Sequence, residues 1–279
     1  MIQSNSLLVD IAVNLTDKAF ESDLPDLLAR ASAAGVGQMV ITGSTLAESR
    51  RAMELCQQLG PQFGQQLYAT AGVHPHYSRD FPIDGKEQIK ALLKHACVKA
   101  VGETGLDFNR DFSPRPQQIH AFEQQLELAV ELGQPILMHE RDAGTTFYEM
   151  VKAHRDQFSK GVLHCFTGDR EQLFRLLDLD LHIGITGWIC DERRGQHLQS
   201  LLKEIPLDRL MLETDAPYLL PRDIRPKPKP RRNEPAYLQH ICQRAAEFIG
   251  ISTEQLTQAT SHTARQFFNL DQQGHTAEK

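Results

Sequence analysis

Side chains that bind metal ions or carry protons stand at the ends of short apolar runs in this sequence, and one run each is closed by Glu103, His139, His164 and Asp215. Two imidazoles and a carboxylate can hold a divalent cation and leave positions open for water and substrate. A cation held in this way lowers the pKa of bound water or polarises a phosphoryl oxygen. We therefore predict a metal centre at Glu103, His139 and His164. Asp215 would orient the water or accept its proton.

The apolar runs repeat at about the length of one strand and one helix. There are eight of them, over residues 7–14, 38–43, 67–76, 98–108, 135–141, 161–168, 181–188 and 210–217. Strands that alternate with helices form a parallel sheet, and eight such units close a (β/α)8 barrel of the TIM type. Active sites of this barrel form where the C-terminal ends of the strands meet. The pattern thus predicts one α/β barrel with its site at that end.

Helix signals fill the gaps between these runs. The pattern over 23–34 ends at Gly35, and 45–59 is expected to stop at Gly60. A segment over 116–132 opens with proline and stops at glycine, as helices commonly do. Further helices are expected over 145–157, 170–178 and 195–204, with two more after residue 235, the second opened by a capping box of Ser252 and Gln255.

Alternation of side chains along a strand predicts which residues point into the barrel. By this rule Val101 shares a face with Glu103, and Leu137 shares a face with His139. Glu213, two residues before Asp215, would lie one layer deeper. Inward orientation of the run ends would bring the carboxylates and imidazoles together at the mouth.

Length and hydrophobicity limit the class of protein. The chain has 279 residues, 41% of them hydrophobic, which suits one barrel of about 250 residues with short extensions. Its apolar runs are shorter than the roughly 20 residues that cross a bilayer, and neither a basic leader nor a twin arginine marks an export signal. We expect a single domain over residues 1–270, a flexible tail over 271–279, and no membrane partner.

Net charge and cysteine content indicate which partners and which cellular compartment suit the protein. A net charge of −6 argues against a protein that coats nucleic acid by bulk charge, although a local basic patch stays compatible with it. Five cysteines without a CxxC pair suit reduced thiols better than a disulfide framework. We expect a cytoplasmic monomer.

Several polar residues allow two interpretations. His74 and His76 in HPH either cap a turn or contact a phosphate or leaving group. Asp107 is either a turn residue or a support for the site. The proline-rich basic loop over 221–235, which includes Arg231 and Arg232, is either a solvated charge run or a track for a phosphodiester backbone.

Residues near the run ends add candidates for substrate binding. Arg141, two residues after His139, could reach a phosphate, because bidentate arginine contacts suit that ligand. Three aromatic residues follow run ends and either stack on bases or belong to the core: Phe108, Phe166 and Trp188.

At these residues the chain resembles the TatD family of metal-dependent deoxyribonucleases. The matching motifs are GVHPH (72–76), GETGLDF (102–108), MHER (138–141), LHCFTG (163–168), GITGW (184–188), ETDAPYL (213–219) and RRNEP (231–235). The resemblance covers nearly the whole chain before the tail. It implies a metal-dependent hydrolase barrel that cleaves phosphodiester bonds. It also implies that Asp215 joins Glu103, His139 and His164 at the metal site, and that His74 lines it in a catalytic role.

The chain departs from the family pattern at its first apolar run. Most members carry D-x-H-x-H there, and its histidines bind one metal. Here Ala12 and Asn14 stand at those positions, so the second metal site is weakened or lost. Fewer nitrogen ligands favour Mg2+ or Mn2+ over tightly held zinc. We predict one firm cation, with a second arriving with the substrate near Asp215 and Asn14.

The DIxVNLT start and the CDERRG segment (190–195) are similar to one branch of the family. That branch is regarded as Mg2+-dependent 3′→5′ exonucleases on single-stranded DNA and RNA, so the resemblance implies this activity, with roles in DNA repair and RNA turnover. Two other functions stay open. The same barrel and ligands serve metal-dependent amide or ester hydrolases, and loss of metal ligands would fit a non-catalytic binding protein.

Overall fold

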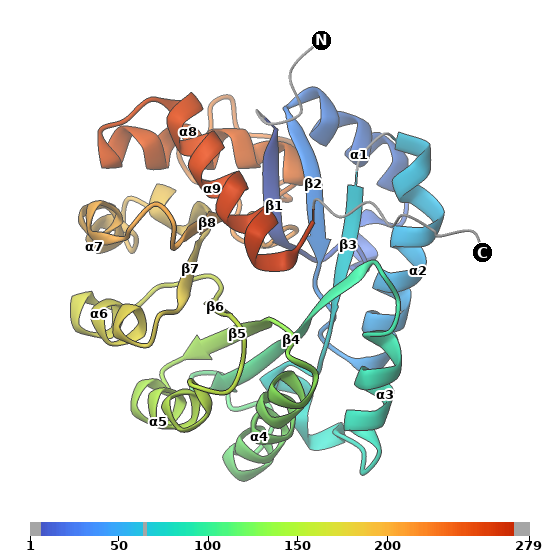
Figure 1. Cartoon of the computed structure of the whole chain (residues 1–279). Helices are drawn as coiled ribbons and strands as arrows, with labels where there is room; N and C mark the ends of the chain where they lie inside the picture. The colour runs from blue at the N-terminus through green and yellow to red at the C-terminus, as the bar shows by residue number, and fades with distance from the viewer. Residues whose placement is uncertain (1–6, 64–65, 271–279) are drawn as a thin grey trace.

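The computed structural model describes residues 7–63 and 66–270, apart from the side chains of 60–63, and shows eight parallel strands in sequential order (Figure 1). The strands are β1 Leu8–Val13, β2 Val36–Ile41, β3 Gln66–Ala71, β4 Val98–Asp107, β5 Ile136–Arg141, β6 Gly161–Leu163, β7 His182–Ile185 and β8 Leu210–Leu212. Just past β8, Asp215 N donates to Ala12 O at 2.9 Å, and Asn14 N donates to Ala216 O at 2.8 Å. These bonds bring the ends of the sheet together, so the predicted barrel is confirmed. The predicted tail over 271–279 lies outside the described residues.

Helices connect the strands and surround them. They are α1 Leu24–Ala33, α2 Leu46–Phe63, α3 Gly85–Leu92, α4 Arg115–Leu132, α5 Gly144–His154, α6 Arg170–Asp178, α7 Gln196–Leu201, α8 Leu238–Ile249 and α9 Thr253–Phe268. Short 3-10 turns are η2 Lys18–Phe20, η3 Pro75–Asp80, η4 Gly187–Cys190, η5 Leu202–Glu204 and η6 Pro235–Tyr237. None of the described helices is both long and apolar enough to cross a bilayer.

Most predicted helix ends are confirmed. The chain turns at Gly35 with φ +80° and at Gly133 with φ +62°, conformations that glycine adopts without steric cost. Ser252 and Gln255 form the predicted capping box of α9. The predicted stop at Gly60 is wrong, because α2 continues to Phe63. A glycine inside a helix costs only about 1 kcal/mol relative to alanine, so it does not have to end one.

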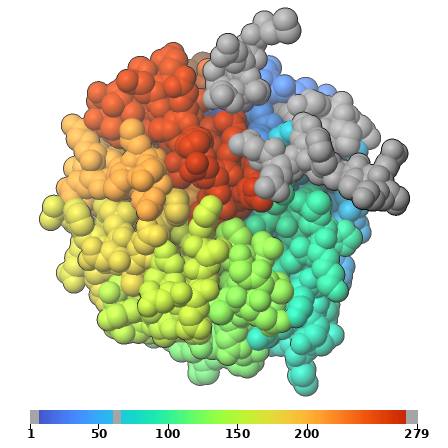
Figure 2. Space-filling view, viewed as in Figure 1, coloured from blue at the N-terminus to red at the C-terminus, as the bar shows by residue number. Residues whose placement is uncertain are grey.

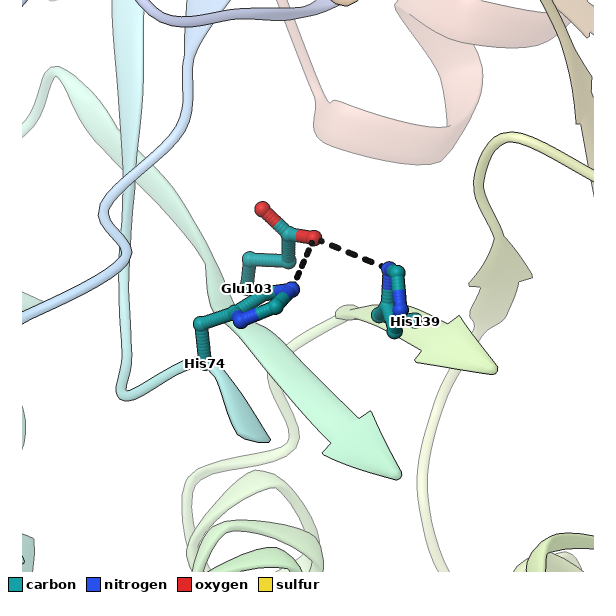
Figure 3. A group of neighbouring side chains, drawn as sticks. All are labelled: His74, Glu103 and His139. Atoms are coloured by element: carbon teal, nitrogen blue, oxygen red, sulfur yellow. Dashed lines mark ion pairs between the residues drawn. The ribbon is translucent and has the colours of Figure 1, made fainter. Parts of the chain in front are cut away.

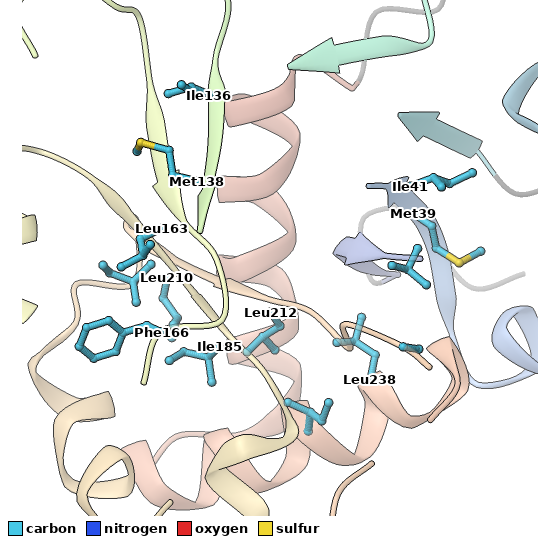
Figure 4. Close-up of a cluster of buried hydrophobic side chains, with 14 of the residues drawn as sticks. Met39, Ile41, Ile136, Met138, Leu163, Phe166, Ile185, Leu210, Leu212 and Leu238 are labelled. Carbon is cyan, nitrogen blue, oxygen red and sulfur yellow. The ribbon is translucent and has the colours of Figure 1, made fainter. Parts of the chain in front are cut away.

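The larger part of the core lies between the barrel and its helices. Figure 4 shows side chains of this layer, among them Met39 and Ile41 of β2, Ile136 and Met138 of β5, and Leu238 of α8. Strand residues one position away point into the barrel instead, and they form a second cluster with the end of α9: Val9, Ile11, Val40, Ala100, Leu137, Val162 and Met211.

Helix α9 closes the barrel at the end opposite the predicted site. Phe267 and Phe268 pack against the inward-facing strand residues, and each is only 1% exposed. Burying one such ring stabilises the fold by about 2–3 kcal/mol. Figure 2 shows α9, in red, at the centre of this face. With this end filled by side chains, the C-terminal ends of the strands remain for the site.

A long segment without helix or strand runs from β8 to η6, as predicted for its basic part. Arg232 fixes it to the start of α1, because its Nη2 lies 2.8 Å from both Asp23 Oδ2 and Glu234 Oε1. The guanidinium also covers the ring of Phe20, 4.9 Å from the ring centre. The expected role of Arg232 in substrate binding is therefore corrected to a structural one, since both carboxylates already bind its charge.

Replacing Arg232 with Gln should lower the free energy of unfolding by about 2 kcal/mol, since charged hydrogen bonds are lost at a side chain that is only 13% exposed. In a chain of this size we expect the melting temperature to fall by about 5 °C. Arg231→Gln removes the same charge from an exposed residue and serves as the control, with little change in melting. An unchanged melting temperature together with a raised KM for Arg232→Gln would restore the substrate-binding interpretation.

Candidate active site

Three imidazoles converge on one carboxylate oxygen at the C-terminal ends of the strands. Glu103 Oε1, on β4, lies 2.7 Å from His164 Nε2, 3.2 Å from His74 Nε2 and 3.4 Å from His139 Nδ1. Figure 3 shows His74 and His139 pointing at this oxygen from opposite sides. Ligand atoms of His74, Glu103 and His139 all lie within 4.8 Å of one another. His74 thus joins Glu103 and His139 in one possible ligand group, while His164 makes the shortest contact with Glu103 Oε1.

Glu103 enters the site because β4 is irregular. Val101 packs in the outer core, so strict alternation would turn Glu103 outward as well. The pairing of β4 with β5 shifts register between Val101 and Thr104, and this reverses the alternation. The predicted shared face of Val101 and Glu103 is therefore wrong, although the predicted inward orientation of Glu103 is confirmed.

Glycine at position 105 permits the close approach of β4 to β5 beside the site. Gly105 has φ +137°, and a Cβ placed there would lie 1.9 Å from the carbonyl oxygen of His139. No other residue type fits this position without moving a strand. The GETG segment thus positions both Glu103 and the neighbouring β5 ligand.

A second carboxylate, Asp107, supports the imidazoles. Its Oδ2 lies 2.7 Å from His76 Nε2 and 3.5 Å from His139 Nε2. The structure shows both interpretations of Asp107, because its Oδ1 also accepts hydrogen bonds from Asn109 N at 3.0 Å and Arg110 N at 2.8 Å in the turn after β4. HPH caps a turn, as one of its two interpretations has it, because His74 Nδ1 accepts a hydrogen bond from His76 N at the start of η3. The other nitrogen of His74, Nε2, faces Glu103, and contact with a phosphate or leaving group stays a prediction.

His164 and Glu213 follow directly after the short strands β6 and β8. His164 Nδ1 lies 3.4 Å from Glu213 Oε2, and Glu213 Oε1 accepts a hydrogen bond from Cys165 N. Glu213 is fully buried behind His164, at the deeper layer that was predicted for it. This carboxylate therefore orients His164 toward Glu103.

Asp215 lies in the same pocket, held by the residue that replaces a family histidine. Asn14 Nδ2 donates to Asp215 Oδ1 at 3.0 Å, and Asn14 Oδ1 accepts from Thr42 Oγ1 at 2.6 Å. The amide of Asn14 thus donates to Asp215, while its oxygen already accepts one hydrogen bond from Thr42. Ala12 is fully buried in the inner core cluster, where it has no ligand atom to offer.

Burial and mutual contacts set the charges of the cluster. Burial by itself would raise the pKa of Glu103, but the charges of His164 and His74 hold it well below its ordinary value. Burial lowers the pKa of His74 to about 4, whereas the carboxylates around His139 and His164 raise the pKa of both. Glu103 is therefore ionised, His74 neutral, and the other two imidazoles favour the protonated form.

This arrangement fits a divalent cation. Three buried polar atoms of this cluster have no hydrogen-bond partner among the described residues: His139 Nε2, His164 Nδ1 and Glu213 Oε2. The carboxylates that now stabilise protonated imidazoles would equally stabilise a cation, and metal binding would release those protons. Imidazole and carboxylate groups are both ligands that divalent cations take in proteins.

The pocket above Glu103 has a volume of about 660 Å³ and an aromatic rim. Tyr77, Phe112 and Tyr218 line it and are 44%, 53% and 55% exposed, while Arg110 adds a positive charge. None of these four side chains was among the binding residues predicted from the sequence. Exposed aromatic rings around a site are unusual, and nothing in the spacing of these residues marked them as neighbours.

The other predicted binding residues are placed as follows. Phe166 is 2% exposed in the core, which excludes base stacking. Phe108 packs against the core beneath Arg115. Trp188 stays accessible beside the site, where Arg141 covers its ring at 5.6 Å. Arg231 lines a shallow hollow of the 221–235 loop outside the central pocket.

Comparison with known proteins agrees with the geometry. The family described as TatD related DNase matches residues 9–269. The 3′-5′ ssDNA/RNA exonuclease TatD of Edwardsiella piscicida is 49% identical over 263 residues, which cover 94% of this chain and 100% of that protein.

Two solved structures have the same architecture. A TatD homologue of Escherichia coli K12 is 27% identical with a TM-score of 0.84, covering 95% of this chain and 99% of its own. A TatD family hydrolase of Entamoeba histolytica is 25% identical with a TM-score of 0.85, covering 94% and 98%. From its barrel, its site and these matches over nearly its whole length, the chain belongs to the TatD family of related DNases.

Proposed function

We propose that the protein is a Mg2+-dependent 3′→5′ exonuclease that hydrolyses phosphodiester bonds of single-stranded DNA and RNA. The observation that carries the proposal is the Glu103 cluster beneath a pocket whose rim holds three exposed aromatic side chains. Unpaired bases stack on such rings, and a strand end must enter the pocket to reach Glu103. The 49% identical relative, which bears the name of such an exonuclease, supports the same assignment.

The proposed roles follow from the positions of the side chains. Glu103, His139, His164 and Asp215 would hold the cation, and neutral His74 would complete the set or contact the phosphate. A bound divalent cation supplies polarisation of the phosphoryl oxygen and a lower pKa for water. Asp215, oriented by Asn14, is placed to accept the proton of the attacking water. Tyr77 and Tyr218 would stack on the terminal bases.

One firmly held cation is the proposed resting state. Ala12 and Asn14 offer no second ligand set, since one lacks a donor atom and the other donates to Asp215. A second cation would then arrive with the substrate phosphate. Manganese soaked into crystals without nucleic acid should give a single strong anomalous peak at Glu103, and two full peaks would contradict this part of the proposal.

Labelled single strands test the direction of degradation and its dependence on a metal ion. A short single strand with a 5′ label should give a ladder of products shortened from the 3′ end in Mg2+, and EDTA should stop the reaction. The same strand in a duplex should react more slowly. No cleavage with Mg2+, Mn2+ or Zn2+ would overturn the proposal. Turnover of amide or ester substrates instead would support the alternative hydrolase.

The strand beyond the pocket is proposed to pass over Arg141 and Trp188. Arg141 Nη1 donates to Thr167 Oγ1 at 3.0 Å, and among the described residues no ion pair engages its guanidinium. Arg194 lies over the same indole, 4.5 Å from the ring centre. The three side chains form a hollow of about 440 Å³ next to the strand ends. On this path Arg141 takes the place of Arg232 as the proposed phosphate contact. Contact of Arg231 with the phosphodiester backbone stays a prediction.

Arg141→Gln should raise KM for a single strand by about 5- to 10-fold with little change in kcat, because the residue binds substrate and transition state alike. Losing one phosphate contact should also reduce the slope of log KM against log salt by about 0.7. Arg209→Gln removes an equal charge at the start of β8, at the opposite end of the barrel, and is the control. Equal salt slopes in the two variants would remove Arg141 from the path.

The cellular location, biological roles and oligomeric state of the enzyme belong to the same proposal. All five cysteines are free thiols in the structure, which supports a reducing, cytoplasmic location. Roles in DNA repair and RNA turnover, and action as a monomer, follow from the family resemblance and the composition.

A further inference from the structure

A second group of metal-binding side chains lies outside the active-site pocket. Cys190 ends η4, Asp223 belongs to the segment after β8, and His240 is on α8. Their ligand atoms all lie within 4.8 Å of one another. None of the three lines the pocket above Glu103. Residues 33 and 17 positions apart along the chain thus meet at one point of the fold, from three separate elements.

We propose that Cys190, Asp223 and His240 bind one Zn2+ ion, with water as the fourth ligand, and that this ion anchors the 221–235 segment to the barrel. A thiolate, an imidazole and a carboxylate are the three ligand types that tetrahedral zinc takes. Mg2+ accepts oxygen ligands and does not bind thiolate in this way. The site would therefore be selective for a different metal from the one proposed at Glu103.

The contacts already present approach the geometry that zinc needs. His240 Nε2 lies 2.7 Å from Asp223 Oδ1. Bond lengths of about 2.0–2.3 Å at tetrahedral angles place nitrogen and oxygen ligands about 3.3 Å apart, and sulfur and nitrogen about 3.5 Å apart. Opening the His240–Asp223 pair from 2.7 Å to this spacing needs a shift of about 0.6 Å, and the His240 ring, at 28% side-chain exposure, has room for it. The Cys190 sulfur lies within 4.8 Å of both ligand atoms.

A neighbouring arginine orients the carboxylate. Arg244 Nε lies 2.9 Å from Asp223 Oδ2, the oxygen that faces away from His240. Oδ1 stays available as the ligand atom, while the ion pair with Arg244 engages the other carboxylate oxygen. Groups that hold the far side of a metal ligand in this way raise metal affinity and are typical of protein zinc sites.

The charge of the site also favours a cation. Cys190 is 4% exposed, and burial together with the Asp223 carboxylate raises the pKa of its thiol far above its ordinary value. Without metal the thiol thus stays neutral beside a carboxylate. Zinc reverses this, because a coordinated thiol loses its proton outright. Thiolate and carboxylate then balance the two charges of the ion.

Zinc binding would hold the basic 221–235 segment in place near its start. Arg222, next to Asp223, already pairs with Glu192 at 3.1 Å beside Cys190. The chain from Glu213 to Glu234 has neither helix nor strand, so few backbone hydrogen bonds hold it. A bond from Asp223 through an ion to η4 and α8 supplies a fixed point in the middle of this stretch. The proposed site is independent of the nuclease proposal, since none of its residues contacts Glu103.

Cobalt is the probe for the test. Metal-free protein titrated with Co2+ should develop a thiolate-to-cobalt charge-transfer band in the near ultraviolet, and one equivalent of Zn2+ should remove it. Cobalt at Glu103 gives no such band unless a thiol binds it. Cys165 lies in that pocket, so Cys165→Ser is the matched control and should keep the band. Cys190→Ser should lose it while retaining the circular dichroism of the parent protein.

A third variant keeps the test decisive if Cys190→Ser does not fold. His240→Gln changes a partly exposed side chain and should require at least about tenfold more cobalt to reach half of the band. Absence of a thiolate band in the parent protein would overturn the proposal. A band that survives Cys190→Ser, or disappears in Cys165→Ser, or has the same cobalt dependence in His240→Gln, would overturn it equally.

Discussion

Replacing Glu103 with Gln should lower kcat/KM by at least about 10³-fold, which is roughly 4 kcal/mol of transition-state stabilisation. Oε1 of Glu103 is the one atom that three imidazoles share, so it is the centre of the proposed metal site. Glutamine keeps the volume and removes the charge. Metal affinity should fall along with activity, and isothermal titration with Mn2+ measures that part separately.

The control for Glu103→Gln is a carboxylate in the same pocket that contacts no imidazole. Glu48 lines the pocket and is half-buried, and Glu48→Gln should change kcat/KM by less than about 10-fold. Melting curves of both variants in EDTA should resemble that of the parent, which separates loss of function from loss of fold. Undiminished activity of Glu103→Gln would exclude Glu103 from catalysis.

Alternation and strand order explain why most of the site could be predicted from the sequence. Leu137 and Val162 fill the inner core, and the residues two positions later, His139 and His164, reach the mouth from the same side of their strands. This regularity holds because neighbouring strands of a parallel barrel end at the same level. Residue type at a strand end was therefore enough to find three of the converging groups.

Where the backbone is irregular, the sequence rule fails. A register shift in β4 turns Glu103 inward against the alternation that Val101 sets, and no residue type announces the shift. His74 belongs to a 3-10 turn after β3, so its distance from Glu103 depends on the path of that turn. Local geometry of this kind depends on tertiary packing, which periodicity does not encode.

The sequence also does not show which charged side chains are already paired in the fold. Arg232 and Arg141 are alike as residue types, yet one is held by Asp23 from a distant helix and the other has no described carboxylate partner. Only the fold shows which arginine is available. The same holds for Asn14, whose amide orientation is set by Thr42 on the next strand. Residue type predicts what a side chain can bind, and the partners it already has decide whether it does so.

Asp215→Asn should lower kcat by about 10²- to 10⁴-fold with little effect on KM, the range expected for loss of a general base. Burial, with Glu103 and Glu213 nearby, raises the pKa of Asp215 from 3.8 to about 7. A bound cation favours the ionised carboxylate, so activity of the metal-loaded parent protein should rise with pH below this value, since only the ionised carboxylate accepts a proton. The Asn variant should lack this ascending limb.

Two further changes should move the ascending limb of the pH–activity profile in opposite directions. Asn14→Ala removes a hydrogen bond that lowers the pKa of Asp215, so the limb should shift to higher pH. Saturating Mn2+ favours the ionised carboxylate and should shift it to lower pH. A profile that is identical in the parent and in Asn14→Ala would show that another group controls the limb.

The pH dependence of stability tests the ionisation of the Asp215 carboxyl group independently of catalysis. Because the folded state raises the pKa of Asp215, it favours the protonated form, and the resulting stabilisation is present at low pH and lost as pH rises through about 7. Asp215→Asn cannot ionise and avoids this loss. In EDTA its melting temperature should exceed that of the parent by more at about pH 8 than at about pH 5. An equal difference at both pH values would mean that Asp215 ionises freely in the folded protein, and the buried general base would have to be sought elsewhere in the pocket.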